Sequence, residues 1–201
     1  MCLDHGTYPY VTSSSPTGSG VPLYAGIAPK YVNNVLGICK AYTTRVGEGP
    51  FPTEIESDTA SYIRERGHEY GTVTKRPRRI GWLDLFALNY ARRVSGINYL
   101  ALMLIDVLSG LDEIKVCTGY KIDGKVINYI PATIKELHKV EPVYLTLPGW
   151  NEDITNAKTF DELPNNAKIY IRKIEELTKT EVAIISVGPD RSQTIKIKDI
   201  F

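Results

Sequence analysis

The sequence predicts an α/β fold, with a mostly parallel sheet, flanking helices and an added antiparallel hairpin. Residues 99–106 form an almost unbroken apolar run that ends in a carboxylate, and residues 182–186 form a second apolar run. Strands that are apolar on both faces are typical of the centre of a covered parallel sheet. Residues 165–178 instead carry their apolar side chains on one stripe, which indicates a helix that covers such a sheet.

In the first half of the chain, loops are expected to alternate with helices and strands. Residues 1–28 are rich in Gly, Ser, Thr and Pro, which favours a flexible loop. Pro29 suits a first helical turn, and apolar residues recur at helical spacing up to Tyr42, which predicts a helix there. A strand is expected at 42–46. Further helices are expected at 59–66, ended by Gly67, and at 85–94, ended by Ser95-Gly96.

The second half is expected to begin with a hairpin. Residues 113–130 alternate in polarity around Asp123-Gly124, a pair that favours a type I′ turn. A short helix at 133–138 and a short strand at 143–147 follow. Asn165 is expected to cap the helix that ends at Thr178, and residues 193–197 are expected to form an edge strand.

Composition favours one domain with no global electrostatic field. The 201 residues are enough for one sizeable core, and 24 Lys and Arg nearly balance 23 Asp and Glu. This balance argues against nucleic acid and anionic membranes as partners. The chain has no run of 18 apolar residues and no signal peptide pattern, so a cytoplasmic protein without a membrane segment is expected.

The cysteines and histidines give no sign of a metal site or of proton transfer. Cys2, Cys39 and Cys117 are odd in number, far apart and without C-x-x-C spacing, which favours reduced thiols and no metal cage. None of the three histidines, His5, His68 and His138, has an acid at a useful spacing, so none is predicted to transfer protons.

A basic run is the strongest candidate for a binding site. Residues 71–82, GTVTKRPRRIGW, hold four cations within five residues, after two hydroxyls and between two glycines. Several arginines on one turn suit a ligand with several anionic oxygens, because each guanidinium can make two parallel hydrogen bonds. The alternative is a solvated basic turn, which charge clusters usually are.

Four motifs in the same order resemble the adenylosuccinate synthetase family. The basic run resembles that family's aspartate-binding loop, and residues 4–14, DHGTYPYVTSS, are close to its signature. Residues 43–54, TTRVGEGPFPTE, and residues 186–191, SVGPDR, match as well. The matches extend from residue 4 to residue 191, so the resemblance covers nearly all of the chain.

The resemblance implies three sets of ligand contacts. L-Aspartate would be bound by Thr72, Val73, Thr74, Lys75, Arg76, Pro77 and Arg78. Inosine monophosphate (IMP) would be bound by Thr12, Val46 and Arg76, with Thr12 at the phosphate and Gly47 along the ribose. GTP would be bound by Arg78, Leu104, Ile105, Asp106, Ser186, Val187 and Gly188, with Asp106 accepting hydrogen bonds from the guanine.

Three positions depart from the family pattern, and two assignments keep a simpler alternative. Leu104 stands where the family has a lysine over the guanine, Lys75 where it has a glycine, and Pro77 where it has a basic residue. Loss of one charge-assisted contact costs about 1.5–3 kcal/mol, so weaker or less discriminating GTP binding is expected. The alternative is that Leu104 still covers the ring by apolar packing. Asp106 has an alternative role as a cap for the next turn, and Thr12 as a turn hydroxyl.

The resemblance begins partway into the family and covers roughly its second half. The sequence lacks both G-x-x-x-x-G-K-[ST] and the family's Gly-Asp-Glu-Gly-Lys-Gly loop, which carries the catalytic Asp and the Mg²⁺ ligand. The catalytic His is upstream in the family too. Residues 1–201 are therefore expected to be a single domain or fragment, the C-terminal half of a P-loop-related fold, with no catalytic residue and no activity alone.

The resemblance also implies the partners of the complete enzyme. GTP would be the co-substrate, Mg²⁺ the cofactor, and the protein a homodimer whose subunits complete each other's IMP site. Two rival functions are a non-catalytic module that binds purine nucleotides, and a nucleic-acid binder that uses residues 75–79. The near-neutral composition argues against the second.

Overall fold

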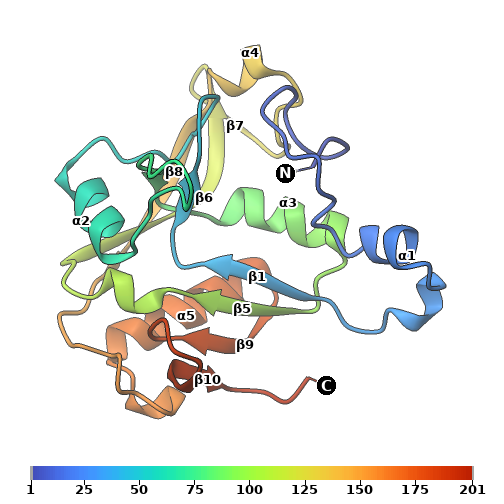
Figure 1. Ribbon diagram of the computed structural model, residues 1–201. Coiled ribbons are helices and arrows are strands. Elements are labelled where there is room, and N and C mark those ends of the chain that lie inside the picture. Colours follow the sequence, from blue (N-terminus) through green and yellow to red (C-terminus); the bar gives the residue numbers. More distant parts are fainter. Residues whose placement is uncertain (1, 201) are drawn as a thin grey trace.

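A four-stranded sheet forms the centre of the fold, and the computed structural model describes residues 2–200. The strand order is β1 (Leu36–Lys40), β5 (Tyr99–Met103), β9 (Glu181–Ser186) and β10 (Thr194–Lys196). β1, β5 and β9 run parallel, and β10 joins antiparallel at the edge (Figure 1). The predicted central strands and edge strand are thus confirmed.

Two amphipathic helices pack against each other beside this sheet (Figure 1). In α3 (Leu85–Ser95), the Asp84 carboxylate accepts from the Ala87 amide at 2.9 Å and so caps the first turn. α5 (Asn165–Thr178) buries Ala167, Tyr170, Ile171 and Ile174, which are members of the apolar stripe in the sequence. α5 also contacts β9, so the apolar stripe faces the core.

A second sheet contains the predicted hairpin. It consists of β4 (Leu83–Asp84), β6 (Glu113–Ile122), β7 (Lys125–Ile127) and β8 (Glu141–Pro148), with β6 paired to all three others. Asp123 and Gly124 both have positive φ, 50° and 75°, as a type I′ turn requires. A short helix, α4 (Ile134–Leu137), lies between β7 and β8, and Thr133 caps it.

Shorter elements complete the chain. β2 (Thr43–Arg45) and β3 (Arg79–Gly81) form a two-stranded sheet, and α2 (Asp58–Arg66) ends at Gly67 as predicted. α1 (Gly20–Ala25) is a helix within the segment that was predicted to be a loop. The part of the chain that the structure describes also has 3₁₀ helices at Pro29–Tyr31, Ile105–Leu108, Phe160–Glu162 and Arg191–Gln193.

The helix predicted from Pro29 to Tyr42 is wrong. Only the three residues from Pro29 form a 3₁₀ helix, and β1 follows. Gly37 lies in β1 against the side chain of Ile97, and β1 pairs with β5 along its whole length. The apolar spacing fitted a helix, but pairing with the central strand overrides a local pattern of this kind.

Two predicted boundaries also change. β5 ends at Met103 rather than at Asp106, because Leu104 takes a left-handed conformation with φ 62° and turns the chain into a 3₁₀ helix. Asn165 does not cap α5: Pro164 is the N-cap residue and Asn165 is the first residue of the helix. Among the described residues, no helix is long and apolar enough to cross a membrane.

The packing of two glycines gives a matched test of this fold. A Cβ at Gly149 would overlap the carbonyl oxygen of Leu111, whereas a Cβ at Gly119 would meet open space. We therefore expect Gly149→Ala to lower the free energy of unfolding by about 1–3 kcal/mol. Gly119→Ala should leave it unchanged or raise it by up to about 1 kcal/mol. Urea unfolding of both variants measures the difference, and equal effects would contradict the packing described.

Candidate functional site

The last turn of α2 contacts two of the predicted binding segments. The Nε atom of Arg64 donates to the carbonyl oxygen of Arg78 at 2.9 Å, and a terminal nitrogen of Arg66 donates to the carbonyl oxygen of Asp106 at 3.2 Å. The Tyr62 hydroxyl donates to the carbonyl oxygen of Ser109 at 2.6 Å. One helix end therefore holds both the basic run and the segment after β5.

The basic run folds back on itself as a tight turn. The Gly71 amide donates to the Arg76 carbonyl at 2.8 Å, and the Lys75 amide donates to the Gly71 carbonyl at 2.9 Å. The Arg78 amide donates to the Glu69 carbonyl at 2.9 Å, which closes the base of the turn. These bonds place the predicted aspartate contacts on one short turn.

The tip of this turn is open to solvent. All six side chains of residues 72–77 are exposed, and Val73 is 91% exposed. Lys75 has φ 53°, in the left-handed region that glycine adopts most easily. This conformation is a physical reason for the glycine that the family has at the same position.

Glu69, which the sequence analysis missed, holds the base of the turn. Its buried carboxylate accepts from Lys40 Nζ at 2.5 Å, from the Tyr42 hydroxyl at 2.7 Å and from a terminal nitrogen of Arg78 at 2.5 Å. Its side chain is only 1% exposed. An acid shortly before a basic run was the only sequence signal, and it does not distinguish a buried partner from a surface one.

The three donors keep Glu69 ionised. Burial by itself would raise the pKa of Glu69, but the hydrogen bonds from Lys40, Tyr42 and Arg78 outweigh burial and lower that pKa. Arg78 is thus anchored through one nitrogen, and a guanidinium has further N–H donors for a ligand. The structure places Arg78 at the base of the turn, less exposed than the tip.

The predicted guanine contacts gather where β5 and β9 end. Ser186 is buried, and its hydroxyl accepts from the Leu104 amide at 3.2 Å and lies 3.5 Å from the Gly188 carbonyl oxygen. Ile105 and Val187 are fully buried beside these residues. The carboxyl ends of neighbouring parallel strands are where α/β proteins commonly bind ligands. The residues predicted for GTP lie there, except Arg78, which is at the base of the basic turn.

One carboxylate oxygen of Asp106 accepts no hydrogen bond from the described part of the chain. Its Oδ1 atom is buried and has no hydrogen-bond partner there. Burial raises the pKa of Asp106, while the charge of nearby Arg66 opposes that effect. The N-cap residue of the 3₁₀ helix is Leu104, and Asp106 lies inside this helix, so Asp106 does not occupy its capping position. A buried, unpaired carboxylate oxygen is costly, and N–H donors of a ligand would offset that cost.

Arg79 supports the loop predicted to lie along IMP. It forms an ion pair with Glu54 and donates to the carbonyl oxygens of Gly47 and Gly49, at 3.3 and 2.8 Å. Val46 is 67% exposed in this loop, and Gly47 has φ 74°. Arg79 thus has a structural partner, which the sequence analysis did not predict.

Thr12 lies on a neighbouring loop. Its side chain is exposed, and its hydroxyl accepts from the Ser14 amide at 3.3 Å. The guanidinium of Arg45 lies 5.7 Å from the centre of the Tyr10 ring, so the loop containing Thr12 contacts the strand that leads to Val46. A small cavity between these two segments is lined by Gly6, Thr7, Tyr10, Thr43, Arg45 and Pro50, among others.

Comparisons with known proteins show the family to which this chain is similar. A family model described as adenylosuccinate synthetase matches residues 1–195. Adenylosuccinate synthetase from Limosilactobacillus reuteri is 57% identical over 197 residues, which are 98% of this chain and 46% of that protein. The enzyme from Clostridium kluyveri is 56% identical over 198 residues, with the same two coverages. The chain spans about half the length of the curated relatives it matches.

Solved structures show the same fold. The fully ligated adenylosuccinate synthetase from Plasmodium falciparum superposes with a TM-score of 0.94 at 48% identity, covering 98% of this chain and 47% of that one. Cyanophage S-2L succinoaminodeoxyadenylate synthetase gives a TM-score of 0.55 at 18% identity, covering 97% and 43%. The second likeness is one of fold alone.

The pKa of Glu69 predicts how stability depends on pH. Because that pKa is lower in the folded state, the stabilisation is complete above the unfolded value of about 4.3 and is lost as pH falls below it. At pH 7, Glu69→Gln should lower the free energy of unfolding by about 2–4 kcal/mol. This loss should shrink steadily below about pH 4.

Urea unfolding at several pH values measures this effect, with Glu56→Gln as the matched control. Glu56 is exposed, so its substitution should change the free energy of unfolding by less than about 0.5 kcal/mol at every pH. A loss for Glu69→Gln that is independent of pH would rule out an ionised Glu69 as its cause.

Proposed function

The chain belongs to the adenylosuccinate synthetase family, and on that premise we propose that it supplies substrate contacts to a GTP-dependent ligase. The enzyme would join IMP to L-aspartate and release adenylosuccinate, GDP and phosphate, a step of AMP synthesis. In this chemistry the γ-phosphate of GTP is transferred to O6 of IMP, and the aspartate amine then displaces phosphate. As in the family, the working enzyme would be a homodimer.

Asp106 carries the proposal. Its buried Oδ1 has no hydrogen-bond partner within residues 2–200 and lies at the shared end of β5 and β9. Such an acceptor suits the N1–H and exocyclic amine of guanine. The turn from Ser186 to Gly188 adjoins it through the Ser186–Leu104 hydrogen bond and would face the guanine O6. Ile105 and Val187 would pack beneath the base.

The basic run would bind aspartate with the residues at its tip, Thr72, Val73, Thr74, Lys75, Arg76 and Pro77, together with Arg78 at its base. Arg76 would also reach IMP, whose phosphate would meet Thr12 and whose ribose would lie along Val46. Arg78, anchored by Glu69, would reach from aspartate towards GTP. Anchoring an arginine before the ligand arrives reduces the entropy lost on binding.

Mg²⁺ accompanies GTP in this family. The sequence contains neither form of the phosphate-binding loop, so no residue of this chain is proposed as a Mg²⁺ ligand, and no catalytic residue is assigned within it. The role proposed for the residues of this chain is to bind and orient the guanine of GTP, IMP and L-aspartate.

Binding of nucleic acid is disfavoured by the ion pairs of the basic run. Arg78 pairs with Glu69 and Arg79 pairs with Glu54, so two of the four cations already face a carboxylate. A phosphate backbone is bound through charges that release counterions, and paired cations contribute little to that effect.

Calorimetry with GDP tests the guanine site. Asp106→Asn should weaken GDP binding by about 10- to 150-fold, because a charge-assisted contact of about 1.5–3 kcal/mol is lost. Leu104→Lys should strengthen binding, because it restores the charge that the family places over the base. Asp112→Asn is the control, since Asp112 is exposed. Equal GDP affinity for Asp106→Asn and Asp112→Asn would refute the assignment.

Urea unfolding of Asp106→Asn tests whether this variant is folded. The raised pKa of Asp106 means that the folded state disfavours its ionised form. Asp106→Asn should therefore unfold at a urea concentration equal to or higher than that of the wild type at pH 7. A large loss of stability would show instead that the carboxylate is needed for the fold.

A GDP-release assay tests the division of roles. The purified 201-residue chain, given GTP, Mg²⁺, IMP and aspartate, should release no GDP above background, because it has no phosphate-binding loop. Turnover above background would contradict the proposal that these residues only bind and orient the substrates.

A further inference from the structure

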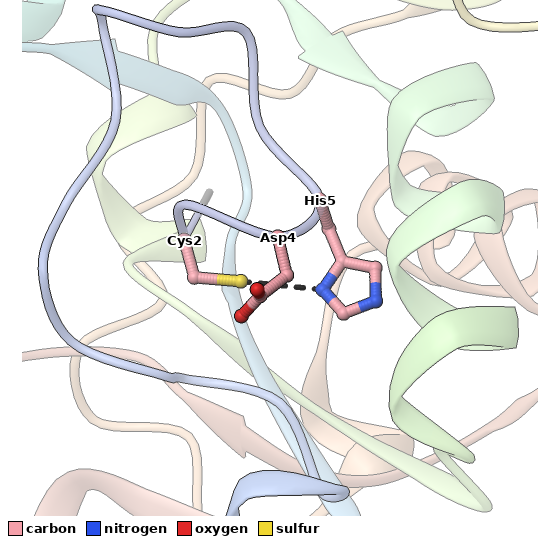
Figure 2. Close-up of side chains that lie close together, drawn as sticks. All are labelled: Cys2, Asp4 and His5. Carbon is pink, nitrogen blue, oxygen red and sulfur yellow. Dashed lines mark hydrogen bonds between the residues drawn. The ribbon is translucent and has the colours of Figure 1, made fainter.

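We propose that Cys2, Asp4 and His5 form a site for a zinc-like divalent cation. The three side chains extend from one turn at the start of the described chain and converge (Figure 2). Asp4 places a carboxylate near the His5 ring, although no proton transfer is assigned to His5. The sequence analysis predicted no metal site, because the three cysteines are far apart and lack C-x-x-C spacing; the proposal departs from that prediction. The proposal is independent of the reaction proposed above.

The backbone brings the three side chains together. The Gly6 amide donates to the Cys2 carbonyl at 2.8 Å and the His5 amide donates to the same oxygen at 3.4 Å, which closes a tight turn. Cys2 also forms a β-bridge with Thr12, which fixes the start of the turn against the chain ten residues later. Cys2 is 2% exposed, so the thiol is held in place by the fold.

The distances suit a small tetrahedral ion. The Cys2 Sγ and His5 Nδ1 atoms lie 3.2 Å apart, and one ligand atom from each of the three residues lies within 4.8 Å of the others. Sulfur at about 2.3 Å from zinc and nitrogen at about 2.0–2.1 Å would lie about 3.5 Å apart. Asp4 is exposed, so its carboxylate can rotate inward at little cost.

The donor atoms select the class of metal. Thiolate, imidazole and carboxylate together are typical zinc ligands, whereas Mg²⁺ and Ca²⁺ prefer oxygen alone. Cys2 and His5 share a hydrogen bond in the structure. When the ion binds, the thiol loses its proton to solvent and the neutral imidazole coordinates through Nδ1. Three protein ligands would leave a fourth position for water.

The proposed cation site would stabilise the conformation of residues 4–14, the motif nearest the start of the chain. The bridge between Cys2 and Thr12 joins the turn to the residue proposed for the IMP phosphate. A bound cation would therefore stiffen the loop of residues 2–12 without touching the proposed guanine contacts.

Titration of the reduced, chelator-treated 201-residue chain with Zn²⁺ tests the site. We expect one equivalent to bind in the micromolar range or tighter, and millimolar Mg²⁺ not to displace it. Co²⁺, used as a spectroscopic probe, should give a near-ultraviolet thiolate charge-transfer band. Cys2→Ser should abolish this band and weaken Zn²⁺ binding more than about 100-fold, since the replaced ligand is the thiolate itself.

Two milder variants keep the test decisive if Cys2→Ser does not fold. Asp4→Asn and His5→Asn should each weaken Zn²⁺ binding by at least about tenfold. Cys39→Ser and His138→Asn are the controls, and they should leave both the band and the affinity unchanged. Absence of zinc binding to the wild type, retention of the band in Cys2→Ser, or unchanged affinity in both Asp4→Asn and His5→Asn would overturn the proposal.

Discussion

Glu69 is a buried carboxylate on which three segments of the chain converge. Lys40 ends β1, Tyr42 precedes β2, and Arg78 precedes β3, so one side chain connects the edge of the main sheet to the smaller two-stranded sheet. Removing one partner of a buried ion pair is strongly destabilising, because it leaves the other charge without compensation. The geometry of the basic turn therefore depends on this carboxylate, although Glu69 itself is buried beneath the turn.

Parallel strands and one helix end account for the rest of the site. β5 and β9 finish at the same edge of the sheet, which brings Asp106 beside the turn after Ser186 although 80 residues separate them in sequence. The last turn of α2 then contacts both that edge and the basic run through Arg64 and Arg66. Two arginine side chains that are assigned to no ligand therefore hold the segments proposed to bind guanine and aspartate, because they donate to backbone carbonyl oxygens of those segments.

Much of the fold could be predicted from the sequence, because its central strands and long helices have strong patterns. Local sequence is enough to predict some elements, namely the strands β5 and β9 from their apolar runs, the helix α5 from its apolar stripe, and the turn at Asp123-Gly124. The segment that forms β1 was misassigned, because its apolar spacing fits a helix and only pairing with β5 decides otherwise. For the site, the motifs led to the ligand contacts that are proposed above. They could not indicate Glu69 or the α2 arginines, whose roles depend on residues distant in sequence.

The strand β1 has a further consequence for the behaviour of this chain in solution. In the described residues, β1 is bonded to β5 on one side only, and Ile38 near its middle is 76% exposed. An open strand edge with a large apolar side chain is a template for another strand, and proteins usually protect such edges. Concentrated samples would therefore be prone to edge-to-edge association, and a lysine in place of Ile38 would oppose it through charge repulsion.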